Sequence, residues 1–430
     1  MGFRTVHTAV TQVIVILSNV LQQHADDAAA LATNRRALSG AAYVKLPRLR
    51  RADQRLDANL DGLRIAGDDA SRFCDAALES PSSGAVFTLA IRALEGKNKS
   101  RLDQLMALAQ AVPQVLPGLL CALGWVDPTL LRGTVASLLH DPDDFRRMVG
   151  VAACSMHRVD PGIVSGEYLR DPEAIVRARA FRAAGELGLT EVVSSCVVAA
   201  RGDDEPEIQF WAAWSAVLLG DRSIAVDVLT NRGLLPGAHR ARSFRLAFQA
   251  MSTSAGHGIL QGLARDPQQT RWLIQGSGIA GDPVYVPWLI TRMGELNTAR
   301  LAGEAFTLIS GVDLGMDVLD RPAPENFESG PNDDPDDPNI DMDPDNGLSW
   351  PDVAKIDKWW AANGSRFASG TRYFMGAPIT RGHCIEVLKN GYQRQRILAA
   401  HYLCLLEPGT PLFNTSAPAW RQQRLLAKMT

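Results

Sequence analysis

The chain has 430 residues, of which 46% are hydrophobic and 21% charged, and its formal net charge at pH 7 is -3. This composition supplies a core of ordinary size, and the nearly neutral charge excludes a general attraction to nucleic acid or to an anionic membrane. The six cysteines lie far apart, at no metal-binding or redox spacing, so we expect small core residues in a reducing compartment.

Residues 1–80 predict an N-terminal helical cap. The apolar run from Val13 to Leu17 is shorter than the core of a signal peptide or a membrane span, so we expect a cytoplasmic protein without membrane contact. From Leu49 to Gly67 the chain places Leu, Ala and Arg at helical spacing and ends on a glycine.

Residues 81–312 predict an array of helical repeats. Helix starts in which an acidic N-cap precedes a proline recur at intervals of about thirty residues, and they lie at Asp141, Asp171, Glu205 and Asp266. Shorter second helices are predicted to begin at Asp127, Asp160 and Asp282. Two helices per step of this length are typical of an α-solenoid.

The clearest repeat helix runs from Asp171 to Gly188. We predict that Asp171 caps it, that Pro172 occupies the first helical position, and that Gly188 ends it in a left-handed conformation. One apolar stripe follows the helical period and contains Val176, Ala180, Ala183, Ala184 and Leu187.

This repeat resembles the short HEAT-like repeats of phycobilisome lyases. The likeness depends on Asp171-Pro172, Val176-Arg177, Ala180, Ala184 and Leu187-Gly188, and with the regular spacing it covers about residues 81–312. It implies an all-α fold, an α-α superhelix in which stacked two-helix units bury the faces that no unit can bury alone.

Residues 313–349 interrupt the array as an acidic, Pro-rich insertion. From Glu325 to Asp345 the chain has nine acidic residues, several prolines and no Lys or Arg, which predicts an extended loop. The stretch from Asp341 to Asp352 resembles part of an EF-hand loop, but Asn346 stands where the turn glycine belongs. We therefore favour a solvated linker over a calcium site and expect no metal.

Gly276 to Gly281 matches the letters of the GxGxxG dinucleotide motif. A helical pattern precedes it and Asp282-Pro283 starts the next helix only afterwards, so we predict a turn between helices and no cofactor. The histidines are scattered, and GxSxG, Walker, HExxH and CxxC motifs are absent, which argues against an enzyme.

Residues 350–430 predict a C-terminal helical repeat and cap. The features from Gly303-Glu304 through Trp359-Trp360 to Arg394 and Arg396, with the Leu49 to Gly67 segment, resemble a family of HEAT-repeat proteins encoded in proteobacterial type VI secretion gene clusters. This resemblance implies the context of type VI secretion and does not itself define a mechanism. Because a solenoid offers a long concave face suited to recognising another protein, we predict a non-catalytic protein that binds an effector or a PAAR-like spike-tip protein, as an immunity protein or as an adaptor.

The candidate partner-binding residues are acidic residues of the insertion and aromatic and basic residues that follow it: Asp333, Asp334, Asp336, Asp337, Asp341, Asp343, Trp359, Trp360, Arg394 and Arg396. For the tryptophans, packing beneath the loop is an equal alternative, since aromatics at helical spacing are usually core. Two other functions stay open: an enzyme or lyase-like chaperone, which would need a deep pocket lined by His, Asp or Tyr, and a structural scaffold that self-associates.

Overall fold

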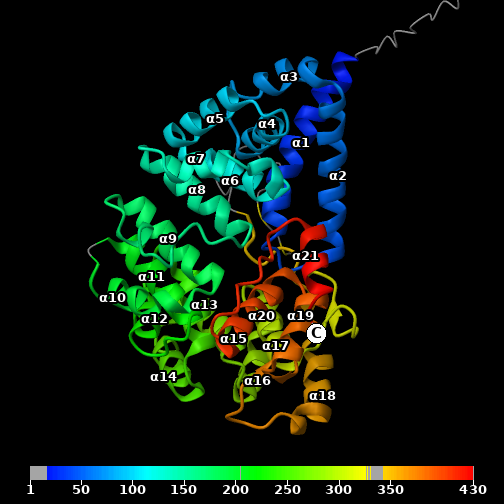
Figure 1. Ribbon diagram of the computed structural model, residues 1–430. Helices are drawn as coiled ribbons and strands as arrows, with labels where there is room; N and C mark the ends of the chain where they lie inside the picture. The colour runs from blue at the N-terminus through cyan, green and yellow to red at the C-terminus, as the bar shows by residue number, and fades with distance from the viewer. Residues whose placement is uncertain (1–16, 204, 326, 328–329, 331–341, 430) are drawn as a thin grey trace, which may run out of the picture. The chain divides into compact units, whose positions relative to one another are not determined.

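The computed structural model describes residues 17–203, 205–325, 327, 330 and 342–429. Over these residues the chain forms 21 α-helices, and its strands are two-residue pairs (Figure 1). The predicted all-α solenoid fold with an insertion near the C-terminus is confirmed.

Two compact units divide the chain. Unit 1 contains the described residues up to Arg35 together with Ala52–Val126, and unit 2 contains Arg36–Arg51 and Asp127 onward. The unit boundary thus falls near residue 126, whereas the sequence pattern placed a boundary between the cap and the repeats at residue 80. The helices of residues 81–126 belong to the N-terminal unit.

Unit 1 is built on the long helices α1 (Ser18–Leu38) and α2 (Leu46–Ile65), within which the chain passes to unit 2 and back. Its other helices are α3 (Ser71–Ala76), α4 (Ser83–Glu95), α5 (Lys99–Ala111) and α6 (Leu116–Trp125). A buried ion pair, 2.8 Å from Arg35 to Asp53, joins α1 to α2. At Gly84 a Cβ would collide with the carbonyl of Ala29, so this glycine lets α4 approach α1 closely.

Unit 2 contains the repeat array. Its helices are α7 (Thr134–Leu139), α8 (Asp144–Met156), α9 (Ala174–Leu187), α10 (Val193–Gly202), α11 (Pro206–Leu218), α12 (Ile224–Leu234), α13 (Arg240–Ala250), α14 (Thr253–Leu263), α15 (Thr270–Ala280), α16 (Val286–Arg292) and α17 (Ala299–Ser310). Helices α8, α9, α11, α13, α15 and α17 contact one another in succession and form one layer. Between them, α10, α12, α14 and α16 each pack against the next helix of that layer, as in a solenoid.

The turn before α9 differs from its prediction. Helix α9 begins at Ala174 with Glu173 at the N-cap, and the Asp171 carboxylate accepts a hydrogen bond from the Glu173 amide at 2.9 Å. Arg177 donates to the carbonyls of Asp171 and Pro172 at 2.9 and 2.7 Å. Asp171 therefore shapes the turn and does not cap the helix, whereas Gly188 ends α9 in the left-handed conformation, as predicted.

The same turn recurs in the neighbouring repeats. Arg147 donates to the Asp141 carbonyl at 3.0 Å, and its remaining nitrogens hold the Asp171 carboxylate of the next repeat at 2.9 and 3.0 Å. At the following turn Gln209 donates to the carbonyl of Asp203. An acidic residue and a donor six positions later thus recur, and Arg147 also joins its repeat to the next.

Of the three shorter helices that were predicted, two are 3-10 turns and the third does not form. Asp127 and Asp282 cap the 3-10 turns Pro128–Leu131 and Pro283–Tyr285. At Asp160 no helix begins; its carboxylate accepts from the amides of Gly162 and Ile163, which closes a turn instead.

The GxGxxG stretch is not the predicted turn. Gly276 and Gly278 lie inside α15, and only Gly281, with φ of 72°, stands at the end of the helix. A Cβ on Gly278 would lie 2.8 Å from the Ala305 Cα of α17. These glycines allow helices to approach closely, so packing accounts for their presence here.

The C-terminal elements of unit 2 complete the fold. They are β1 (Asp320–Arg321), β2 (Trp350–Pro351), α18 (Val353–Asn363), β3 (Tyr373–Phe374), β4 (Ala377–Pro378), α19 (Arg381–Asn390), α20 (Gln393–Leu406) and α21 (Ala419–Leu426). Antiparallel pairing joins β1 to β2 and β3 to β4.

Residues 372–412, here named the C-terminal strap, run along the carboxyl ends of the array helices. Arg372 donates to the carbonyls of Gln249 and Met251 at the end of α13, at 2.6 and 2.7 Å, and to that of Ala280 in α15, at 3.1 Å. The Tyr373 amide then donates to the Gly281 carbonyl at 2.8 Å.

The other end of the strap reaches the first helices of the array. Leu412 donates its amide to the carbonyl of Glu186 in α9 at 3.1 Å and accepts from Arg158, which follows α8, at 3.1 Å. Arg222, which follows α11, donates to the carbonyl of Leu405 at 3.0 Å. The strap thus supplies donors to carbonyls at the ends of α9, α13 and α15, and arginines of the array supply donors to carbonyls of the strap.

Candidate partner-binding site

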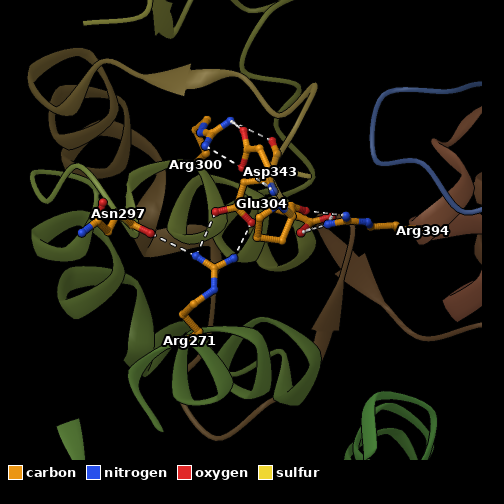
Figure 2. A network of polar contacts seen from close by, with 8 residues as sticks. Arg271, Asn297, Arg300, Glu304, Asp343 and Arg394 are labelled. Atoms are coloured by element: carbon orange, nitrogen blue, oxygen red, sulfur yellow. Dashed lines mark hydrogen bonds and ion pairs between the residues drawn. The ribbon is translucent and has the colours of Figure 1, made fainter. Parts of the chain in front are cut away.

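Three arginines from three helices hold the C-terminal end of the acidic insertion (Figure 2). We name Arg271 of α15, Arg300 of α17 and Arg394 of α20 the arginine clamp. Arg300 donates to both carboxylate oxygens of Asp343 at 2.7 and 3.1 Å, and Arg271 to both of Asp345 at 3.0 and 2.5 Å. Paired bonds of this kind fix orientation as well as distance.

Arg394 completes the clamp from the other side. It donates to both carboxylate oxygens of Glu304 at 3.2 and 3.0 Å and to the carbonyl of Pro344 at 3.1 Å (Figure 2). Burial raises the pKa of Glu304, although Arg394 acts in the opposite direction. At Asp343 burial also disfavours ionisation, but the bonds from Arg300 and the Asp345 amide outweigh it and lower the pKa.

The two ends of the insertion are joined at its base. β1 pairs with β2 in the register Asp320 to Pro351 and Arg321 to Trp350. The Arg300 guanidinium lies 4.8 Å from the Trp350 ring centroid and 4.6 Å from that of Phe327. The insertion therefore leaves and rejoins the fold at one anchored place.

The calcium hypothesis has no support in this geometry. The carboxylates of Asp343 and Asp345 are both bound to arginines, and Asp352 caps α18 by accepting from the Lys355 amide at 3.2 Å. Within the described residues, no group of three or more His, Cys, Asp or Glu side chains could hold a metal ion.

A polar cavity of about 130 Å³ lies beside the clamp, and Glu304, Asp313, Tyr392 and Arg394 are among its lining residues. Asp313 accepts from the Tyr392 hydroxyl at 3.0 Å, and the Lys45 ammonium lies 3.4 Å from the same carboxylate. Burial and the nearby Asp313 raise the pKa of Tyr392 to about 12. The cavity is smaller than the roughly 300 Å³ at which small-molecule sites begin.

The predicted aromatic pair packs against the array. Trp359 and Trp360 are partly buried, and their ring centroids lie 5.7 and 6.2 Å from that of Phe306 in α17. Trp360 also contacts Phe367 at 5.4 Å. This geometry is that of the packing alternative, in which the rings form part of the core of the C-terminal elements.

Arg396 does not lie on a surface, contrary to its prediction as a partner-binding residue. It is completely buried, and its guanidinium donates to the Leu388 carbonyl at 2.7 Å and to side-chain oxygens of Gln393 and Gln422. Burial lowers its pKa to about 10. It joins α20 to α19 and α21 within the interior.

The predicted residues Asp333, Asp334, Asp336, Asp337 and Asp341 lie outside the described residues. Asp343 and Arg394 are brought together in the clamp through Glu304 and Pro344. Sequence reasoning missed Arg271 and Arg300, because in sequence they are ordinary charged residues of repeat helices. Only the fold shows that they lie opposite the insertion.

Comparison with protein-family models, with curated proteins and with solved structures finds no match. Among the described helices, none alone has both the length and the apolar composition of a membrane span, although the bent pair Lys99–Ala111 and Pro113–Trp125 meets both criteria jointly.

Proposed function

We propose that this chain is a non-catalytic, cytoplasmic protein-binding solenoid of type VI secretion. Its partner would be a cognate effector or a spike-tip protein, which it would bind as an immunity protein or an adaptor. The observation that supports this proposal best is the anchoring of the acidic insertion, whose ends are fixed by β1, β2 and the arginine clamp.

Anchoring matters because association must overcome the entropy lost when a segment is ordered. A segment whose ends are already fixed loses less than a free tail of the same length. Apart from the clamped Asp343 and Asp345, the stretch from Glu325 onward has further acidic residues and no Lys or Arg to neutralise them. Such a segment attracts a basic protein surface and raises its rate of encounter.

The enzyme or lyase-like alternative needs a pocket that can enclose a substrate. The cavity beside the clamp has Asp313 and Tyr392 in its lining, but it is small, and these two groups bond to each other. A larger, open cavity of about 490 Å³ lies at α10, and its lining includes Asp203 but neither His nor Tyr. Protein binding is therefore the better-supported proposal, and the scaffold alternative is distinguished by sedimentation of the pure chain at micromolar concentration.

The test is a pull-down and calorimetric titration with the product of the neighbouring gene. We expect a complex, and we expect Asp→Asn substitution at Asp333, Asp334, Asp336 and Asp337 to weaken it about tenfold or more, since the steering charge is removed. The absence of any complex would refute the proposed function.

A matched control removes the same charge elsewhere, at the exposed residues Glu191, Glu205, Asp227 and Asp357. This variant should bind almost as well as the natural chain. Equal weakening in both variants would show that net charge, and not the insertion, determines the affinity.

A further inference from the structure

A second group of arginines lies in the first half of the array. We name Arg182 of α9 and Arg242 and Arg245 of α13 the α9–α13 arginine cluster. The guanidinium carbons of Arg182 and Arg242 lie 4.5 and 5.0 Å from the ring centroid of Trp211 in α11. Arg242 is exposed and Arg182 and Arg245 are partly exposed, so a ligand can reach all three.

The cluster has more positive charge than its neighbours neutralise. Arg182 forms an ion pair with Glu186 at 2.8 Å, but that carboxylate also binds Arg179 at 2.8 Å. Within the part of the chain that the structure describes, neither Arg242 nor Arg245 donates a hydrogen bond or forms an ion pair. Desolvation of its guanidinium by the surrounding protein, with Arg182 and Arg245 nearby, lowers the pKa of Arg242 to about 10 although part of the side chain is exposed.

The position of Trp211 is fixed before any ligand arrives. Its indole nitrogen donates to Glu207 at 2.8 Å, its ring meets that of Trp214 at 5.5 Å, and only 6% of the residue is exposed. A guanidinium that lies over an aromatic ring keeps its edge nitrogens free to bind an anion. Carboxylates fit such an edge with two parallel hydrogen bonds.

We propose that the α9–α13 arginine cluster binds the carboxylates of an acidic peptide segment in a partner protein. The proposal rests on the proposed function only in that the ligand belongs to a protein, and its site is separate from the acidic insertion. A nucleic acid fits less well, because three arginines flanked by Glu186 and Glu207 are too few to neutralise the long row of phosphates on which such binding depends.

The test titrates the full chain with a short poly-L-glutamate peptide while tryptophan fluorescence and heat are followed. We expect binding that weakens at least about tenfold in the double variant Arg242→Gln/Arg245→Gln, because both unpaired guanidinium groups are lost. Arg242→Lys/Arg245→Lys keeps the positive charge but loses the planar guanidinium with its two parallel donors, so this variant should bind the peptide with intermediate affinity.

The matched control is Arg201→Gln, which removes a charge from the exposed face of α10 and should leave the affinity unchanged. Circular dichroism and thermal melting confirm that each variant is folded. Absence of poly-glutamate binding, or equal binding by the natural chain and the double Gln variant, would overturn the proposal.

Parallel titrations with inorganic phosphate and with a single-stranded oligonucleotide complete the design. Either one binding as tightly as poly-glutamate would overturn the assignment to acidic peptide. Because no cognate partner is used, failure here leaves the pull-down result unaffected, and the two proposals are tested independently.

Discussion

The arginine clamp and the α9–α13 arginine cluster differ in whether their arginines have carboxylate partners within this chain. In the clamp, Arg271, Arg300 and Arg394 each bind a carboxylate of this chain through two hydrogen bonds. In the cluster, Arg242 and Arg245 have no such partner among the described residues. The paired arginines fix the structure of this chain, whereas the donors of Arg242 and Arg245 stay available for the acidic ligand that we propose.

Substituting a residue of the arginine clamp should lower the free energy of unfolding more than the other substitutions described below. Arg300→Ala leaves the mostly buried Asp343 without its partner, and removing one member of such a pair costs about 3–5 kcal/mol. We expect the free energy of unfolding of unit 2 to fall by about this amount in denaturant titration. Hydrogen exchange should rise over residues 343–350.

Two variants sharpen this measurement. Arg300→Ala/Asp343→Ala should cost less than the sum of the single changes, since no charge is left unpaired. Glu407→Ala, which removes an exposed ion-pair member 3.4 Å from Arg381 and away from the insertion, should change stability by less than about 1 kcal/mol. A small loss in Arg300→Ala would show that the clamp does not hold the insertion.

An intermediate effect concerns pH and His401, which borders the cluster. Its ring nitrogen lies 2.9 Å from the Gln249 side-chain oxygen, and burial, Arg245 and Arg242 lower its pKa to about 3. In the unfolded chain His401 binds a proton below about pH 6.5, whereas in the folded chain it stays neutral down to about pH 3. The stability that the neutral, buried ring contributes is therefore complete above about pH 6.5 and is lost as the pH falls toward 3.

The melting temperature measured against pH tests this sign. His401→Gln should reduce the loss of stability between pH 7 and pH 5, by at most about 1.4 kcal/mol per pH unit. Arg245→Gln should have a smaller effect in the same direction, because it removes a positive charge that lowers the His401 pKa. If both variants show the same dependence of melting temperature on pH as the natural chain, His401 is not the cause of the loss of stability at low pH.

The smallest effect is expected within the cluster itself. Arg242 is exposed and pairs with no carboxylate among the described residues, so Arg242→Gln should change the free energy of unfolding by less than about 0.5 kcal/mol. Denaturant titration beside Arg300→Ala tests the contrast directly. A decrease in the free energy of unfolding comparable to that of Arg300→Ala would mean that Arg242 stabilises the fold and is not available to bind a ligand.

The sequence predicted the array because repetition is a local signal. The stripe from Val176 to Leu187 and the glycine at 188 mark a helix of the array without reference to any other segment. The Asp171 cap was wrong because its carboxylate has other partners: it accepts from the Glu173 amide within the turn and from Arg147 of the preceding repeat, a contact between repeats that sequence does not show. The glycines at 276 and 278 were misplaced for the same reason, since their close neighbours lie on other helices.

The candidate site could be predicted only in part. Acidic composition identified the insertion, and Arg394 was among the residues expected near it. Arg394 and Arg396 lie two positions apart and therefore on opposite faces of α20, but only the packing of α19 and α21 shows that the face of Arg396 is the buried one. The sequence did not predict the α9–α13 arginine cluster, because Arg182 and Arg242 are distant in sequence and meet only across Trp211.

The C-terminal strap has a mechanical consequence. A solenoid whose repeats contact only their neighbours can stretch and twist like a spring, and it can lose repeats from one end. Here Arg372 ties α13 to α15, while Leu412 holds α9 from the far end of the same strap. The strap should therefore stiffen this part of unit 2, so that the helices that it joins yield together under load.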